Sequence, residues 1–165
     1  MMLQIKELTH LDEKLAVVEA MVQALPDWFD EGTTISEVVE AVGSFEDMSF
    51  FVAYEAQEAL GFIALKVHNP CTAEIGMMAV LAAHHGKGIG RKLVAHCEAF
   101  CRARKMEFLT VKTVDESDGN DSYRGTRAFY HALGFKPLEV FPKFWGGTEF
   151  PCLFSVKCIR GCDCV

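Results

Sequence analysis

The chain has 165 residues, of which 50% are hydrophobic and 24% are charged, and a mass of 18.3 kDa. This length predicts a single domain over residues 1–165, and the apolar content excludes intrinsic disorder as the main state. The formal net charge of −7 argues against nucleic-acid binding, because phosphate neutralisation needs a cationic surface. The longest nearly apolar stretch, Ile75 to Ala83, is far shorter than the ~20 residues that span a bilayer.

Charge is distributed unevenly along the chain. Residues 1–60 carry thirteen acidic and two basic side chains, whereas the remaining residues carry ten acidic and fourteen basic ones. This asymmetry is compatible with solvated helix surfaces and also with two ligands of opposite sign.

Hydrophobic periodicity predicts the secondary structure in chain order. We expect strands over residues 2–8, 50–54, 60–67, 73–80, 107–113, 135–140 and 151–159. A first helix is expected to be capped by Thr9, and a second, over 35–42, to end at Gly43. A third helix follows a glycine-rich segment at 86–90, and a fourth is expected to be capped by Asp121 or Ser122. This order predicts an α/β fold in which the strands flanking the third helix are parallel.

The glycine-rich segment Gly86-Lys87-Gly88-Ile89-Gly90 lies between a predicted strand and a predicted helix. Glycines allow several N–H groups to point at one anion, and a helix N-terminus adds partial positive charge. Residues 84–105 also carry six basic side chains and one acidic one. We therefore expect a multiply phosphorylated ligand over residues 86–91. The alternative is a tight turn without a ligand, and the segment matches neither the P-loop nor the Rossmann pattern.

This loop and the preceding segment 74–80 resemble the acetyl-CoA-binding region of the GNAT family of N-acetyltransferases, whose loop reads [Arg/Gln]-x-x-G-x-[Gly/Ala]. Residues 123–135 resemble the second half of the family signature, Asn-x-x-Ala-x-x-[Phe/Leu]-Tyr-x-x-x-Gly-Phe. Three positions depart from the family pattern: His85 replaces Arg or Gln, Tyr123 replaces Asn, and Thr126 replaces Ala.

The resemblance implies a mixed central sheet of about seven strands with about four flanking helices, splayed between the fourth and fifth strands. It also implies acetyl-CoA as co-substrate, with the backbone of Met78 and Val80 pairing with the pantetheine arm. The other residues expected to bind the cofactor are His85, Gly86, Lys87, Gly88, Ile89, Gly90, Arg91, Tyr123 and Arg127.

The activity implied by the resemblance is direct attack of an amine on the thioester. Tyr130 matches the family's tyrosine and is expected to protonate the departing thiolate, because a phenol with a pKa of ~10 keeps its proton at pH 7. Of the two adjacent aromatic residues, we expect Phe129 to point inward. Glu74 is the expected base, acting through water, and His68, His84 and His131 are alternative bases.

The acceptor is expected to be a primary amine of a small molecule or a peptide, lying between segments 26–32 and 142–151. These segments supply Trp28, Phe29, Phe144 and Trp145 as apolar walls, and Asp27, Asp30, Glu31 and Glu149 as acids. Such a pocket suits a cationic amine. The alternative to an enzyme is a non-catalytic sensor of acyl-CoA on the same fold.

Seven cysteines without a signal-peptide pattern indicate reduced thiols and a cytoplasmic location. Cys97 and Cys101 are expected in the core. Cys158, Cys162 and Cys164 could hold a metal in a metal-regulated protein, but their spacing matches no paired zinc pattern, so we expect no metal site. We expect neither a nucleic-acid nor a membrane partner, and a homodimer is possible.

Overall fold

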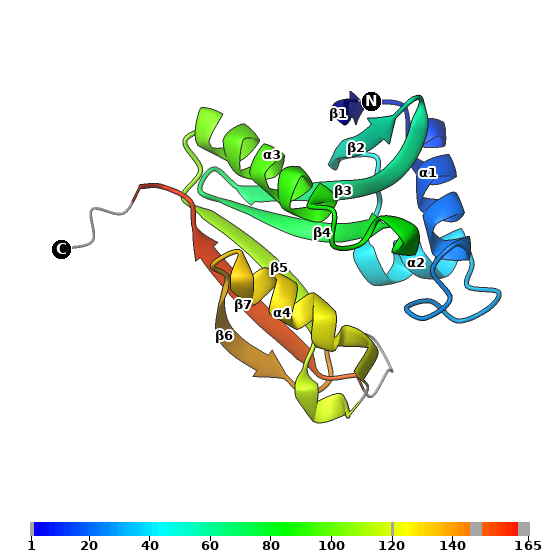
Figure 1. The fold of residues 1–165 in the computed structure, drawn as a ribbon. Helices are drawn as coiled ribbons and strands as arrows, with labels where there is room; N and C mark the ends of the chain where they lie inside the picture. The colour runs from blue at the N-terminus through cyan, green and yellow to red at the C-terminus, as the bar shows by residue number, and fades with distance from the viewer. Residues whose placement is uncertain (1, 120, 146–149, 162–165) are drawn as a thin grey trace.

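The computed structural model describes residues 2–119, 121–145 and 150–161 of the chain (Figure 1). The strands are β1 (Gln4–Leu8), β2 (Ser49–Glu55), β3 (Glu58–Asn69), β4 (Thr72–Val80), β5 (Phe108–Val114), β6 (Lys136–Phe141) and β7 (Cys152–Cys158). The α-helices are α1 (Leu11–Gln23), α2 (Ile35–Val42), α3 (Ile89–Ala103) and α4 (Arg124–Ala132). Within the described residues, these elements confirm the predicted α/β order.

The strands form one sheet in the order β1-β2-β3-β4-β5-β7-β6. Neighbouring strands are antiparallel, except that β4 and β5 are parallel. The parallel pair was predicted, because α3 connects β4 to β5 and a crossover of this kind returns the chain in the same direction.

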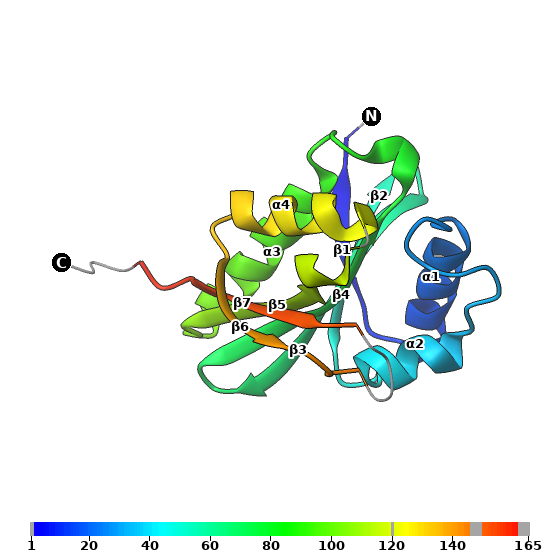
Figure 2. The same cartoon turned by 90° about the horizontal axis from the view of Figure 1, so that it is seen from below.

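Helices cover the two faces of the sheet unequally (Figure 2). Residues of α3 and α4 pack on one face, where alternate β2 residues such as Phe51 and Ala53 meet them. Residues of α1 and α2 pack on the opposite face, against Phe50 and Val52 of the same strand. The second core cluster has no residue from β5, β6 or β7 within the described part of the chain. On this side of the sheet, α1 and α2 therefore do not cover β5, β6 and β7, and a pocket can form there.

A β-bulge at Gly76 reverses the side-chain alternation along β4. Ala64 of β3 pairs with Met77 and Leu65 pairs with Ile75, so Gly76 has no partner on β3. As a result, Ile75 packs with α3, whereas Met77 packs on the α1–α2 face. A bulge of this kind re-aims the side chains that follow it.

The sheet splays between β4 and β5, as the resemblance implied. The two strands pair only over Thr72–Ile75 and Phe108–Val111. Beyond the bulge at Gly76, residues 77–80 of β4 pair with β3 alone, so one edge of the β4 backbone faces an opening in the sheet.

Two predicted helix caps are wrong. The N-cap of α1 is His10 rather than Thr9, because His10 is the last extended residue before the helix. The N-cap of α4 is Tyr123 rather than Asp121 or Ser122, because residues 121–123 form a 3-10 turn that leads directly into the helix. By contrast, α2 ends at Gly43 as predicted.

The thiols of Cys97 and Cys101 are buried in the core, as predicted. Cys162 and Cys164 lie outside the described residues, and the described part of the chain contains no cluster of His, Cys, Asp and Glu arranged to hold a metal ion. None of the described helices is both long and apolar enough to cross a membrane.

Candidate active site

The glycine loop adopts a backbone that favours glycine at two positions. Gly86 has φ +74° and Gly88 has φ +81°, and both values lie in the left-handed region. A Cβ atom at either position would meet nothing within 4 Å. The loop therefore borders open space, and Gly88 is also the N-cap of α3.

The backbone amides of this loop find no acceptor among the described residues. The first helical hydrogen bond runs from the Lys92 N–H to the Gly88 carbonyl, at 3.0 Å. The six amides of residues 86–91 donate to no acceptor within the described part of the chain. Successive free amides at a helix N-terminus form a site for an anion, and the exposed Lys87 and Arg91 side chains add positive charge.

Gly90 allows three elements to meet at the start of α3. A Cβ atom at this position would lie 3.1 Å from the Phe129 ring of α4 and 3.7 Å from the Met78 side chain of β4. The absence of a side chain therefore places the free amides beside both the open edge of β4 and the helix that carries Tyr130.

The His85 side chain lies across the open edge of β4. Its Nε2 atom is 2.7 Å from the Val80 carbonyl oxygen, and its ring makes an edge contact with Trp28 at 5.4 Å. A carbonyl accepts two hydrogen bonds, so the Val80 oxygen retains capacity for a ligand amide. The His85 side chain thus points to the strand edge rather than to the loop amides.

Tyr130 is the buried member of the aromatic pair, and Phe129 is half-buried, so the expected orientation of Phe129 as the inward residue is wrong. The Tyr130 ring packs edge-on against Phe129 at 5.1 Å and against Phe135 at 5.4 Å. Burial raises the pKa of Tyr130 well above its ordinary value. Within the described part of the chain, every side-chain oxygen that is fully buried has a hydrogen-bond partner, whereas the Tyr130 hydroxyl has none. The hydroxyl oxygen is therefore not sealed from an incoming ligand.

The other two predicted residues of this helix have partners within the chain. The Tyr123 hydroxyl donates to the Trp28 carbonyl oxygen at 3.4 Å. The Arg127 guanidinium donates to the carbonyl oxygen of Val114, the last residue of β5, at 2.9 Å. Tyr123 therefore ties α4 to the loop between α1 and α2.

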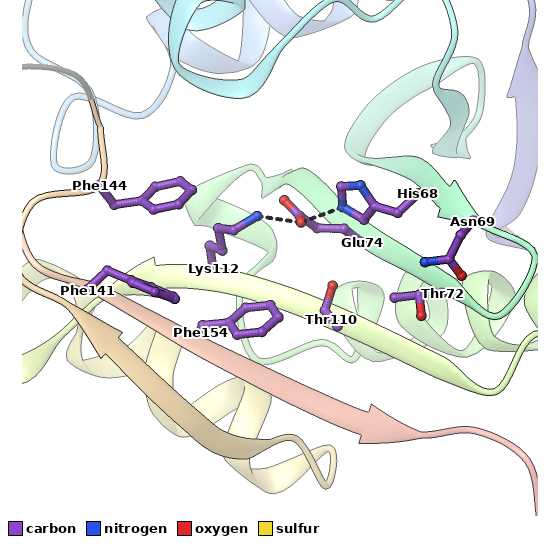
Figure 3. Close-up of a pocket in the computed structure, with 9 residues that line it drawn as sticks. All are labelled: His68, Asn69, Thr72, Glu74, Thr110, Lys112, Phe141, Phe144 and Phe154. Atoms are coloured by element: carbon purple, nitrogen blue, oxygen red, sulfur yellow. Dashed lines mark hydrogen bonds and ion pairs between the residues drawn. The ribbon is translucent and has the colours of Figure 1, made fainter.

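Glu74 points to the sheet face on which α1 and α2 pack, at a part of that face that these helices do not cover (Figure 3). Its Oε2 atom accepts from Lys112 Nζ at 2.5 Å and faces His68 Nε2 at 2.8 Å. The Glu74 side chain is 12% exposed, so the carboxylate is largely shielded from water.

These side chains line a pocket of about 330 Å³. Its other lining residues are Asn69, Thr72, Thr110, Phe141, Phe144 and Phe154. The Lys112 ammonium lies 5.1 Å from the centre of the Phe144 ring and 5.7 Å from that of Phe154. Sequence reasoning did not assign Lys112 or Phe154 to the site. Strand alternation was the available signal, because Lys112 and Thr110 share one face of β5.

The predicted acceptor walls divide between two places. Trp28 and Phe29 pack against the core of α1 and α2, and Trp145 contacts Phe144 edge-on at 5.6 Å beside the pocket. Asp27, Asp30 and Glu31 do not line the pocket, and Glu149 lies outside the described residues. Among the lining residues of this pocket, Glu74 is the acid and Lys112 balances it, and the role of the predicted acids at the acceptor stays a prediction.

Comparisons with known proteins agree with this geometry. A family model described as "Acetyltransferase (GNAT) domain" matches residues 46–137. The uncharacterized N-acetyltransferase CT2212 of Chlorobaculum tepidum is 29% identical over 136 residues, which are 80% of this chain and 79% of that protein.

Solved structures share the fold. An acetyltransferase of the GNAT family from Staphylococcus aureus superposes with a TM-score of 0.74 at 16% identity, covering 96% of this chain and 100% of that one. A GNAT family acetyltransferase from Elizabethkingia anophelis, solved with acetyl-CoA bound, gives a TM-score of 0.65 at 16% identity and covers 94% and 97% of the two chains.

The chain therefore belongs to the GNAT acetyltransferase family. It is an acetyl-CoA-dependent N-acyltransferase, and acetyl-CoA is its co-substrate. The residues present fit this molecule, because six free amides suit its diphosphate and the open edge of β4 suits the amide groups of its pantetheine arm.

Proposed function

We propose that the protein transfers the acetyl group of acetyl-CoA to a primary amine of a small molecule or a peptide, by direct attack of the amine. The observation that carries this proposal is the open edge of β4 beside the six amides of residues 86–91, which have no acceptor within the described part of the chain. Acetyl-CoA supplies an activated acyl group and a thiolate leaving group.

The cofactor side of the site is assigned to the glycine loop and β4. The amides of residues 86–91 would hold the diphosphate, assisted by the Lys87 and Arg91 charges. The backbone of Met78 and Val80 would pair with the pantetheine arm, as an added strand does. We also assign His85, Tyr123 and Arg127 to this side, and their present hydrogen bonds would have to be shared or exchanged on binding.

Tyr130 is assigned as the acid. Its hydroxyl has no competing acceptor in the described chain, and burial keeps its pKa above the ordinary value of ~10. The phenol therefore holds its proton at pH 7 and can donate it from Oη to the departing sulfur.

Glu74 is assigned as the base. An alkyl amine with a pKa of ~10.4 is protonated at pH 7, and removing the proton costs about 4.6 kcal/mol, so a nearby acceptor for the proton is needed. The Glu74 carboxylate lies at the pocket and is shielded from bulk water, and it can take the proton of the amine directly or through a water molecule.

A thiol-release assay tests the proposal. The purified protein is mixed with acetyl-CoA and with amino acids, lysine peptides, polyamines or aminoglycosides, and the free thiol is followed over time. We expect release with at least one primary amine, and a loss of about a hundredfold in kcat for Tyr130→Phe with the Kd of acetyl-CoA retained. Binding of acetyl-CoA without thiol release on any amine would instead favour a non-catalytic sensor.

A further inference from the structure

The pocket around Glu74 is charge-balanced and mainly apolar in its walls. Of its nine lining residues, Glu74 is the carboxylate and Lys112 is the ammonium that pairs with it. Three phenylalanine rings form much of the remaining wall. A polycation would find one carboxylate here, and that carboxylate is already paired.

The Lys112 ammonium occupies a position suited to a ligand amine. It donates to the Glu74 carboxylate at 2.5 Å and lies near the faces of the Phe144 and Phe154 rings. A carboxylate combined with aromatic faces is the environment that proteins use to hold an ammonium ion. Lys112 is also the first residue of β5 beyond its last partner on β4, so it lies where the two strands begin to separate.

We propose that Lys112 is a specificity-determining residue that competes with the acceptor for Glu74, and that the acceptor is a monoamine on an apolar body. This inference rests on the proposed function, because it takes the pocket as the acceptor site. The acceptor ammonium displaces Lys112 from Glu74, and the Lys112 side chain, which is 22% exposed, moves toward solvent.

The competition explains why an apolar body is required. Exchange of one ammonium for another at Glu74 adds little to affinity, so net binding comes from the surface buried against the three phenylalanine rings. Each buried methylene strengthens binding by about fourfold. Small amines lack this surface, and polycations must bring unpaired charges against an apolar wall.

Calorimetry without acetyl-CoA tests the inference with four probes, of which spermidine is the polycation. Phenethylamine carries the ammonium, phenethyl alcohol has the same apolar body without the charge, and phenylacetate carries an anion. We compare the wild type with Lys112→Met and with Lys136→Met, which removes the same charge from an exposed position outside the pocket. We expect Lys112→Met to bind phenethylamine about tenfold more tightly and the alcohol within twofold of wild type, and Lys136→Met to change neither.

Three outcomes would overturn the inference. The first is weaker or unchanged binding of phenethylamine to Lys112→Met. The second is phenylacetate binding that is lost in Lys112→Met, because Lys112 would then read an anion. The third is tighter binding of spermidine than of phenethylamine by the wild type. Lys112→Gln, which retains a hydrogen-bond donor for Glu74, repeats the comparison if Lys112→Met does not fold. Because no acetyl-CoA is present, failure here is distinct from absence of thiol release in the assay above.

Discussion

Substitution of Gly88 by alanine separates the role of the glycine loop in folding from its role in binding. Gly88 has φ +81°, and a non-glycine residue in this region costs roughly 1–2 kcal/mol. The new Cβ atom meets nothing within 4 Å, so no clash adds to this cost. We expect the free energy of unfolding to fall by about 1–2 kcal/mol and the fold to be retained.

Binding of acetyl-CoA should decrease more than this cost implies. If the loop relaxes the strain at residue 88, its amides turn away from the ligand. Loss of one hydrogen bond to a charged group, worth about 1.5–3 kcal/mol, weakens the Kd by about 10- to 150-fold.

Gly134→Ala is the matched control. Gly134 has φ +91°, lies after the far end of α4, and its Cβ atom would make an ordinary contact with Lys157 at 3.6 Å. Urea unfolding should show a similar loss of stability in both variants, while calorimetry with acetyl-CoA should show weaker binding in Gly88→Ala alone. Equal Kd values for wild type and Gly88→Ala would refute the assignment of the loop to the diphosphate.

Three further predictions concern single groups. Glu74→Gln should lower kcat by about a hundredfold and leave the Kd of acetyl-CoA within twofold, and an unchanged kcat would remove Glu74 from the role of base. Because burial raises the pKa of Tyr130, the phenol stays protonated as the pH rises to ~10. Loss of the Tyr130 proton should therefore cause no decline in kcat below pH ~10. A decline below that pH that is present in the wild type and absent in Tyr130→Phe would contradict this expectation. Lys14 is buried, and its ammonium donates to the carbonyl oxygens of Phe45, Glu46 and Met48, so Lys14→Met should lower the free energy of unfolding by about 3 kcal/mol in urea. A loss below about 1 kcal/mol would show that these carbonyls find other donors.

The strand and helix pattern was accessible from sequence because it depends on local periodicity and on glycine. The apolar run Phe50, Phe51, Val52 and Ala53 belongs to a predicted strand, and the structure places these side chains alternately in two separate cores. The caps of α1 and α4 were not accessible in the same way. A cap depends on the residue at which the chain leaves the preceding strand or turn, and several polar residues compete at both positions.

The glycine loop was predictable because the binding that we propose for it depends on the backbone. Gly86 and Gly88 are glycines for a conformational reason, and that reason is visible in the letters alone. The pocket around Glu74 was less accessible, because it depends on which strands become neighbours. Lys112 and Glu74 are 38 residues apart in sequence, and their ion pair follows from the parallel pairing of β4 with β5. The acids of segment 26–32 belong to a loop that contacts α4 and His85 through Trp28, and none of them lines this pocket, which composition could not reveal.

In the function that we propose, the amides of residues 86–91 hold the diphosphate of the co-substrate and direct its sulfur to Tyr130. The most direct measurement is a crystal structure of the protein with acetyl-CoA. We expect diphosphate oxygens within hydrogen-bond distance of these amides, and the sulfur within reach of the Tyr130 hydroxyl. A diphosphate bound elsewhere, or a sulfur separated from Tyr130 by the sheet, would contradict it.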